Sequence, residues 1–251
     1  MKSFSICSDS PVSWCLFADN QDKFCIKDPY PAWHIAAALS EVRHVFLQTF
    51  GKEVVDSHPL LSVIYNEEDP VCFSTQALIF LSASEDITFF QHIYQFSHEL
   101  CHFMVEGKVC GSYRWFEEML CQMMSWYAIL GIYRTREIST CNVLAPYYHM
   151  IPSYLNQDIR KARLNGMSVA EFVRENLTHL QKNCYDRPTN DSIAHGLFPL
   201  FIKHPELWRI VPLLGKIEDR APLNDALRSL AESACLPPVV GNLLHKWLLG
   251  K

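Results

Sequence analysis

Two histidines four residues apart, with a glutamate directly after the first, form the segment of this chain best suited to catalysis. They are His98, Glu99 and His102, within the sequence FSHELCH at 96–102. On an α-helix, residues four apart lie on one face about 5–6 Å apart, so both imidazoles can bind one metal ion. Glu99 is turned about 100° from His98 around the helix axis, which places it to deprotonate a water molecule beside the metal. The pattern therefore predicts a zinc ion held by His98 and His102, with Glu99 as the catalytic general base.

The third metal ligand must come from elsewhere in the chain. One class of zinc peptidases, the metzincins, carries a glycine and a histidine shortly after the second histidine. Val105 and Lys108 occupy those positions here, which excludes that class. Two adjacent glutamates, Glu117 and Glu118, follow, and a helix hairpin that turns at 107–112 would bring either of them opposite the histidines. The residues predict a His₂Glu site with one open position, and nothing physical in the spacing decides between the two glutamates.

The histidine motif followed by the sequence WFEE at 115–118 resembles the gluzincin metallopeptidases, the clan of thermolysin and the M1-type aminopeptidases. The resemblance covers about 77–126 and is closest to the compact minigluzincin core. Alignment with the aminopeptidase pattern Trp-Leu-Asn-Glu implies that Glu118 is the third ligand and that Glu117 stands at the asparagine position. Gln122 then takes the place of the acid with which thermolysin orients a zinc-bound histidine, and an amide can also accept that hydrogen bond.

The resemblance implies a zinc-dependent peptidase or related hydrolase that attacks a peptide bond with an activated water. Gluzincins place a tyrosine or histidine from a downstream helix near the metal to stabilise the oxyanion. The candidates for this role, among which the sequence does not choose, are Tyr147, Tyr148, His149, Tyr185 and His195. A strand near 77–83 is expected to hold an extended peptide by edge pairing. The alternative is a regulatory or non-catalytic zinc-binding protein that acts through a dedicated protein partner.

Hydrophobic spacing predicts the elements that position these residues. Helical spacing and strand-like runs indicate, in order, a helix at 32–50 ended by Gly51, strands at 60–66, 71–73 and 76–81, and helices at 87–105 and 113–130 followed by Gly131. Ser84 is the expected N-cap of the first motif helix. After residue 140 the pattern predicts short helices and no strand, with a polar capping loop at 186–191 before a helix that starts near Ile193.

These elements predict an α+β fold: a small mixed sheet packed on the active-site helix and on a glutamate helix, followed by a mostly α-helical C-terminal half. We expect one metallopeptidase unit over 1–251, with 31–131 as the zincin-like core and 140–251 as a helical subdomain. Cys101, inside the motif, is expected to pack into the core, because free cysteines are usually buried. The apolar stretch 197–208 is expected to be a buried helix pair.

Composition limits the partners and the location. Hydrophobic residues make up 49% of the 251 residues, charged residues 20%, and the net charge is −5, so nucleic acid is not an expected partner. The sequence contains no run of about 18 apolar residues, so no membrane-spanning helix is expected. The ten cysteines contain no Cys-x-x-Cys pair, and the start of the chain does not resemble a secretory signal. A cytoplasmic protein with reduced thiols is therefore predicted. The peptidase motif predicts a peptide or protein as substrate. The sequence does not predict the oligomeric state.

Overall fold

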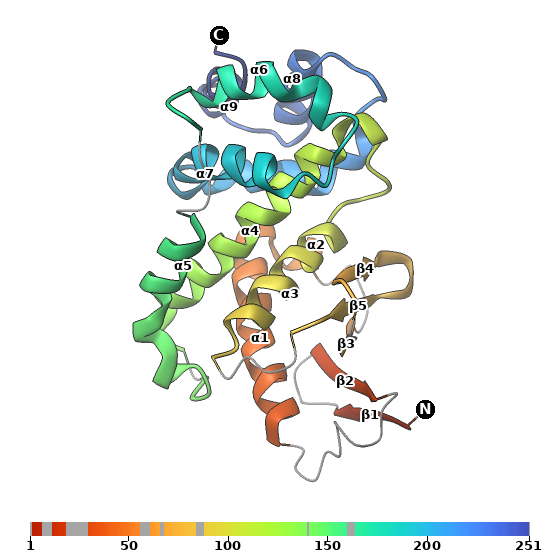
Figure 1. The fold of residues 1–251 in the computed structure, drawn as a ribbon, viewed down its shortest axis with the longest axis vertical. Coiled ribbons are helices and arrows are strands. Elements are labelled where there is room, and N and C mark those ends of the chain that lie inside the picture. The colour runs from red at the N-terminus through yellow and green to blue at the C-terminus, as the bar shows by residue number, and fades with distance from the viewer. Residues whose placement is uncertain are drawn as a thin grey trace. The chain divides into compact units, whose positions relative to one another are not determined.

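The computed structural model describes most of the chain and contains both helices and strands, which confirms the predicted α+β class (Figure 1). The described residues are 2–6, 12–18, 30–55, 61–65, 68–83, 88–139, 141–159 and 164–250. They divide into two compact units, one of Met1–Phe103 with Ser125–Pro152 and one of Met104–Met124 with Ser153–Lys251. One long helix, α4 (Arg114–Thr135), begins in the second unit and ends in the first.

The sheet of the first unit has five strands in the order β1-β2-β3-β5-β4. The strands are β1 (Lys2–Ile6), β2 (Val12–Ala18), β3 (Leu61–Tyr65), β4 (Val71–Phe73) and β5 (Leu78–Leu81). β3 pairs in parallel with β2 and β5, whereas β1 and β4 are antiparallel to their neighbours, so the sheet is mixed. The three strands predicted between 60 and 81 are present. β5 starts later than expected because a 3₁₀ turn at Ser74–Gln76 precedes it, with Ala77 in the left-handed conformation.

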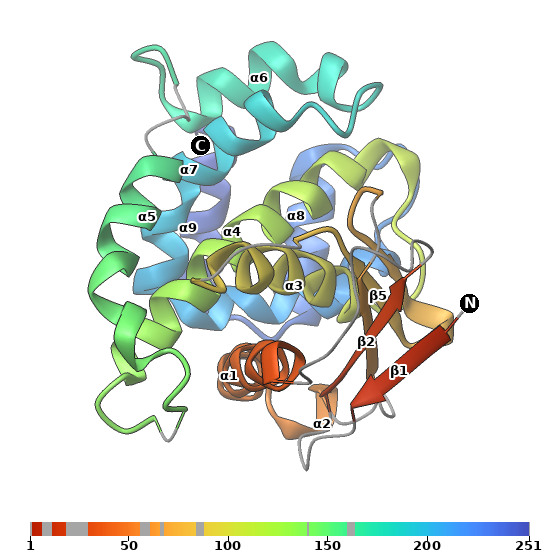
Figure 2. The same ribbon diagram turned by 60° about the horizontal axis from the view of Figure 1, so that its bottom comes forward.

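Two helices of the first unit lie beside the sheet and contact each other (Figure 2). Helix α1 (Tyr30–Phe50) contacts β2, and α3 (Phe90–Phe103) contacts β4 and β5; a short helix, α2 (Lys52–Val55), follows α1. The helix predicted at 32–50 is confirmed, and it ends at Gly51, whose φ of 84° favours glycine. Its apolar side chains at the predicted three- and four-residue spacing are buried, as at Leu39, Val42 and Phe46. The expected cap at Ser84 lies outside the described residues.

The edge-pairing role predicted for 77–83 is wrong, because β5 is an inner strand. It pairs with β3 on one side and with β4 on the other. Beyond the strand, the backbone N–H groups of Ser82 and Ala83 both donate to Gln95 Oε1 of α3, each at 3.1 Å. Gln95 Nε2 in turn donates to Ser82 Oγ at 3.0 Å, so the end of β5 is tied to the helix just before the histidine motif. The edge of the sheet on this side is β4.

Helix α4 does not stop before Gly131, as the sequence pattern predicted, but continues to Thr135. A Cβ atom at position 131 would lie 2.9 Å from Val45 Cγ2 of the same unit. A larger residue would force Val45 or the helix to shift, since atoms 2.9 Å apart would clash. Close packing against Val45 therefore accounts for a glycine in this helix, although glycine in a helix interior usually destabilises the helix by about 1 kcal/mol relative to alanine.

The remaining described chain is helical, and residues 141–159 and 164–250 contain no strand, as predicted. The α-helices are α5 (Ile151–Ile159), α6 (Val169–Leu180), α7 (Arg187–Lys203), α8 (Leu223–Ser233) and α9 (Pro238–Leu249), with 3₁₀ segments at Ala145–Met150 and Pro205–Lys216. Within the second unit α9 contacts α6 and α8, and α7 contacts α6 and the segment Pro205–Lys216. In the stretch 197–208 most of the large apolar side chains are buried as expected, whereas Pro199, Lys203 and Pro205 are exposed. The Phe201 and Trp208 rings lie 4.7 Å apart.

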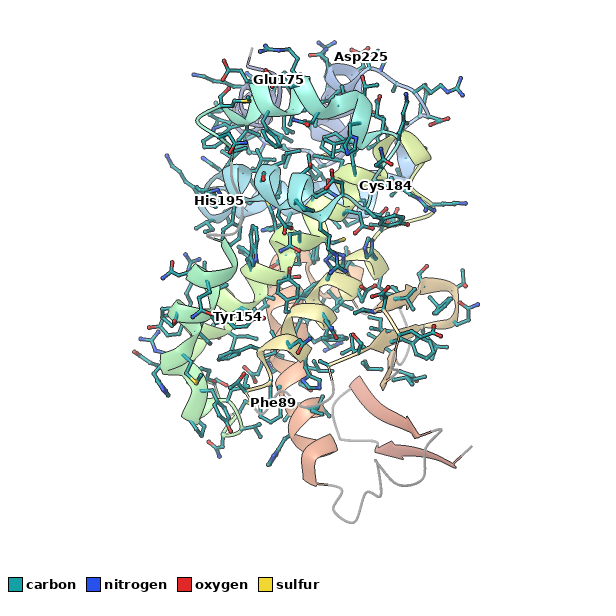
Figure 3. All side chains as sticks on the ribbon, viewed as in Figure 1. Phe89, Tyr154, Glu175, Cys184, His195 and Asp225 are labelled. Atoms are coloured by element: carbon teal, nitrogen blue, oxygen red, sulfur yellow. The ribbon has the colours of Figure 1, made fainter. Side chains whose placement is uncertain are left out.

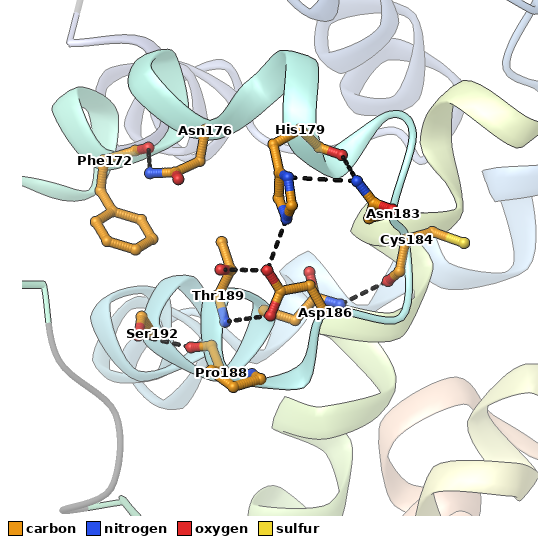
Figure 4. Close-up of polar contacts among 10 residues, drawn as sticks. Phe172, Asn176, His179, Asn183, Cys184, Asp186, Pro188, Thr189 and Ser192 are labelled. Carbon is orange, nitrogen blue, oxygen red and sulfur yellow. Dashed lines mark hydrogen bonds and ion pairs between the residues drawn. The ribbon is translucent and has the colours of Figure 1, made fainter.

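Helix α7 begins at Arg187, six residues before the predicted start near Ile193. The polar run that suggested a loop forms the first turns of the helix, because Asp186 caps it (Figure 4). The Asp186 carboxylate accepts hydrogen bonds from Thr189 Oγ1 at 2.9 Å and Thr189 N at 3.5 Å. It also contacts His179 Nε2 of α6 at 2.8 Å, so this cap joins two helices.

The cap predicts an acid-sensitive contribution to stability. Partial burial of the Asp186 carboxyl opposes its ionisation, but hydrogen bonds from His179 and Thr189 outweigh this and hold the pKa below its usual value. A lowered folded-state pKa means that this stabilisation is present above the unfolded pKa, about 3.9, and is lost as the pH falls through the folded value. We expect Asp186→Ala to reduce the free energy of unfolding by about 1 kcal/mol at pH 7, and by less at pH 3, which lies below the unfolded pKa.

Urea unfolding of wild type and Asp186→Ala at pH 7 and pH 3 measures this difference. Asp186→Asn is the matched control, because asparagine is also a good N-cap but carries no titrating charge. A loss in Asp186→Ala that is equal at both pH values would contradict the assignment.

Candidate metal centre

The predicted motif lies on one continuous helix, α3, and its two histidines are neighbours. The ring centroids of His98 and His102 are 5.0 Å apart, and both side chains are half-buried. Glu99 is 7% exposed, which is unusual for a glutamate and places its carboxylate inside the protein. The helix therefore brings together the three residues predicted from their spacing.

Burial of the other face of α3 explains why this segment is a helix. Phe90, Ile93, Phe96 and Leu100 recur at three- and four-residue spacing and are buried. Cys101 is fully buried as a free thiol, which confirms its predicted place in the core. The motif histidines thus stand on a helix that the core holds firmly.

The glutamates predicted as alternative third ligands lie near the start of α4. Both Glu117 and Glu118 are half-buried. Cys184, labelled in Figure 3, lies near these glutamates in the second unit. Burial and the negative charge of Glu118 raise the pKa of the Cys184 thiol, whereas the positive charge of Arg114 lowers it. Arg114 Nη1 donates to Tyr185 Oη at 3.1 Å. The loop before α7 therefore borders the first turn of α4.

The five oxyanion candidates are spread over different elements. Tyr147, Tyr148 and His149 lie in the 3₁₀ segment Ala145–Met150, and burial raises the pKa of Tyr148. His195 lies on α7 (Figure 3), and Tyr185, 65% exposed, lies in the loop before that helix. Of these, Tyr185 is tied to the glutamate-bearing helix through Arg114. The described contacts do not single out one residue for the role.

A cysteine joins the histidines in the candidate ligand set. The side-chain ligand atoms of His98, His102 and Cys121 all lie within 4.8 Å of one another, close enough for one metal ion. Cys121 is 1% exposed and lies one helical turn after Glu118 on α4. Glu118 is not a member of this group as the described side chains stand. The sequence pattern did not single out Cys121 as a candidate ligand, because no Cys-x-x-Cys spacing marks it. Its signal is its position three residues after Glu118, on the same side of a helix.

A hydrogen bond within the first unit joins the two helices that carry these residues. Ser125 Oγ of α4 donates to the Tyr94 carbonyl of α3 at 3.0 Å. Tyr94 is four residues before His98, and Ser125 is four residues after Cys121. The contact fixes the register between α3 and the C-terminal part of α4.

Comparison with known proteins gives no family: no protein-family model, curated protein or solved structure matches the chain. Within the described residues, no helix has both the length and the apolar character that a membrane crossing requires. The thiols of Cys101, Cys110, Cys141, Cys184 and Cys235 are free.

Proposed function

We propose that this chain is a zinc-dependent hydrolase that cleaves peptide bonds, with a gluzincin-like arrangement of metal ligands. The observation that carries the proposal is the pair of neighbouring histidine rings on α3 with the buried Glu99 between them in sequence. Two imidazoles in this relation suit a divalent transition metal, and zinc is the usual ion for such a set in hydrolases. The packing of the sheet on this helix and on a glutamate helix is part of the same proposal.

The register of α3 and α4 supports a third ligand on α4. Because only the ten residues 104–113 connect the helices, an antiparallel hairpin is the arrangement that fits the Tyr94–Ser125 contact. At a rise of about 1.5 Å per residue, His98 lies about 6 Å and His102 about 12 Å from the level of that contact. On α4, Cys121 lies about 6 Å and Glu118 about 10.5 Å along the axis from Ser125, and we propose that one of them completes the metal site.

Helical rotation favours Glu118 over Glu117. Each residue turns about 100° around the axis, so Glu118 is about 20° from the direction of Ser125, which faces α3. Glu117 is about 80° away, and Cys121 is about 40° away. Glu118 and Cys121 therefore share the face of α4 that carries Ser125. We assign Glu118 as the third ligand of the active form, and Cys121 is the competing candidate for that position.

The chain's own residues supply the remaining chemistry. When bound by His98, His102 and Glu118, zinc would polarise the scissile carbonyl and lower the pKa of water. Glu99 accepts the proton of the attacking water and then passes it to the leaving amine. Its buried position favours this transfer, because an apolar environment strengthens interactions between the carboxylate and the reacting groups.

The substrate chain is proposed to bind along β4 rather than along β5. β4 is the sheet edge that contacts α3, and its Val71 and Phe73 side chains are 36% and 44% exposed. An extended peptide can add to such an edge through backbone hydrogen bonds, with its side chains against the exposed apolar groups.

Hydrolysis of a peptide mixture by the purified protein tests the proposal. We expect cleavage that 1,10-phenanthroline abolishes and that added zinc restores, because the chelator removes the ion that activates water. The non-chelating isomer 1,7-phenanthroline is the control. Cleavage that survives complete removal of the metal would contradict the proposal.

A further inference from the structure

The ten residues 104–113, which we call the α3–α4 connection, are bound by a segment of chain about a hundred residues later. This supporting segment comprises residues 212–221, at the end of the 3₁₀ segment Pro205–Lys216 and just beyond it. Glu106 N donates to the Pro212 carbonyl at 2.9 Å, and the Glu106 carboxylate lies 3.1 Å from Lys216 Nζ. Both partners belong to the second unit.

Gly215 lets the two backbones approach closely. A Cβ atom at this position would lie 2.1 Å from the Glu106 carbonyl oxygen, a distance that real Cβ atoms do not show. The clash would be with main-chain atoms, which cannot rotate away as a flexible side chain can. Glycine is therefore required at 215 if the connection is to keep its path.

The other end of the connection is bound equally directly. Ser112 Oγ donates to Asp219 Oδ1 at 2.9 Å and accepts from Arg220 N at 3.2 Å. The buried Tyr113 donates its hydroxyl to the Ala221 carbonyl at 2.6 Å. Burial, with smaller effects of Cys110 and Asp225, raises the pKa of Tyr113 to about 12, so the hydroxyl keeps its proton at neutral pH.

These contacts lie next to the proposed metal ligands in the chain. Glu106 comes four residues after His102, and Tyr113 comes five residues before Glu118. We infer that the supporting segment is a positioning element for the metal site: it fixes the connection and with it the start of the helix that supplies Glu118 and Cys121. The inference rests on the proposed function. Metal ligands must be held within about 0.5 Å of their productive positions, and the only regular structure in the connection is a 3₁₀ turn at Gly111–Tyr113.

Two variants disturb the supporting contacts without altering a ligand. Gly215→Ala introduces the clash with the Glu106 carbonyl, and Tyr113→Phe removes only the hydrogen bond to Ala221. Gly196→Ala is the matched control: its Cβ would lie 2.3 Å from Val169 Cγ2, in the contact between α7 and α6 of the same unit. All three positions belong to the second unit, but a Cβ atom at Gly196 would face Val169 and Leu164 and not the connection.

The experiment measures zinc affinity by competition with a chromogenic chelator, the visible spectrum of the Co²⁺-loaded protein, and Tm. We expect Gly215→Ala to bind zinc about 10-fold to 100-fold more weakly, as when groups that orient ligands are lost, and to show an altered Co²⁺ spectrum. Tyr113→Phe should show a smaller loss in the same direction. Gly196→Ala should lower Tm yet keep the wild-type affinity and spectrum.

The outcomes separate this inference from the function on which it rests. If Gly215→Ala and Tyr113→Phe, or Tyr113→Phe alone should the first not fold, match wild type in zinc affinity and Co²⁺ spectrum, the positioning role is overturned. A loss in Gly196→Ala as large as in Gly215→Ala would also overturn it, since general destabilisation would then explain both. If wild type binds no zinc, the proposed function itself fails, and the inference fails with it.

Discussion

Glu99→Gln is expected to lower kcat/KM for peptide hydrolysis about 10²-fold to 10⁴-fold while zinc content stays at the wild-type level. Glutamine has nearly the same shape as glutamate but cannot accept the proton of the attacking water. Because Glu99 is turned away from the metal-binding face of the helix, the substitution leaves the ligands in place. The measurement is kcat/KM on the best substrate of a peptide panel, with zinc content determined on the same preparation.

Glu117→Gln is the matched control for this prediction, since it removes a half-buried carboxylate on α4 that we do not assign to the metal. It should retain most of the activity. If Glu99→Gln and wild type hydrolyse peptides equally, the catalytic role of Glu99 is wrong. Equal behaviour in cellular assays as well would favour a zinc-binding protein that acts through a partner without catalysis.

The second large effect is expected from the third ligand. Glu118→Ala should weaken zinc binding by more than about 100-fold, because a His₂ pair alone does not complete a stable zinc site. Glu117→Ala should change the affinity by less than about threefold, since its side chain is turned about 80° around α4 from the direction of Ser125. Zinc affinity of the two alanine variants, measured side by side, decides between the adjacent carboxylates.

Cys121→Ser completes this comparison. With Glu118 intact, the serine variant should keep zinc and activity, and the Co²⁺-loaded wild type should lack the strong near-ultraviolet absorption of a thiolate ligand. If instead the wild type shows that absorption and Cys121→Ser removes zinc, the active ligand set is His98, His102 and Cys121. That result would overturn the assignment of Glu118.

Much of the first unit could be predicted because its signals are local. The helix of the motif follows from apolar residues at three- and four-residue spacing, and the strands follow from short runs of β-branched and aromatic residues. The relation between His98 and His102 needs nothing but the helical repeat. These features depend on residues close together in sequence, and the structure has them within a few residues of the expected bounds, with α3 at Phe90–Phe103 inside the predicted 87–105.

The features that sequence analysis missed depend on residues far apart. β5 is an inner strand only because the antiparallel β4 covers its edge, which no pattern within β5 reveals. Gly131 was expected to end a helix, but it lies inside one, where a Cβ atom would clash with Val45. The support of the α3–α4 connection by Gly215 joins positions more than a hundred residues apart. Periodicity carries no information about such contacts.

Zinc content of the purified protein, compared between wild type and His98→Ala, tests the central claim most directly. We predict about one equivalent in wild type and far less in the variant, because the substitution leaves one histidine and one carboxylate at the site. Both proteins should be folded, as shown by their circular dichroism. Less than about half an equivalent in wild type, or equal zinc in the two proteins, would contradict the account.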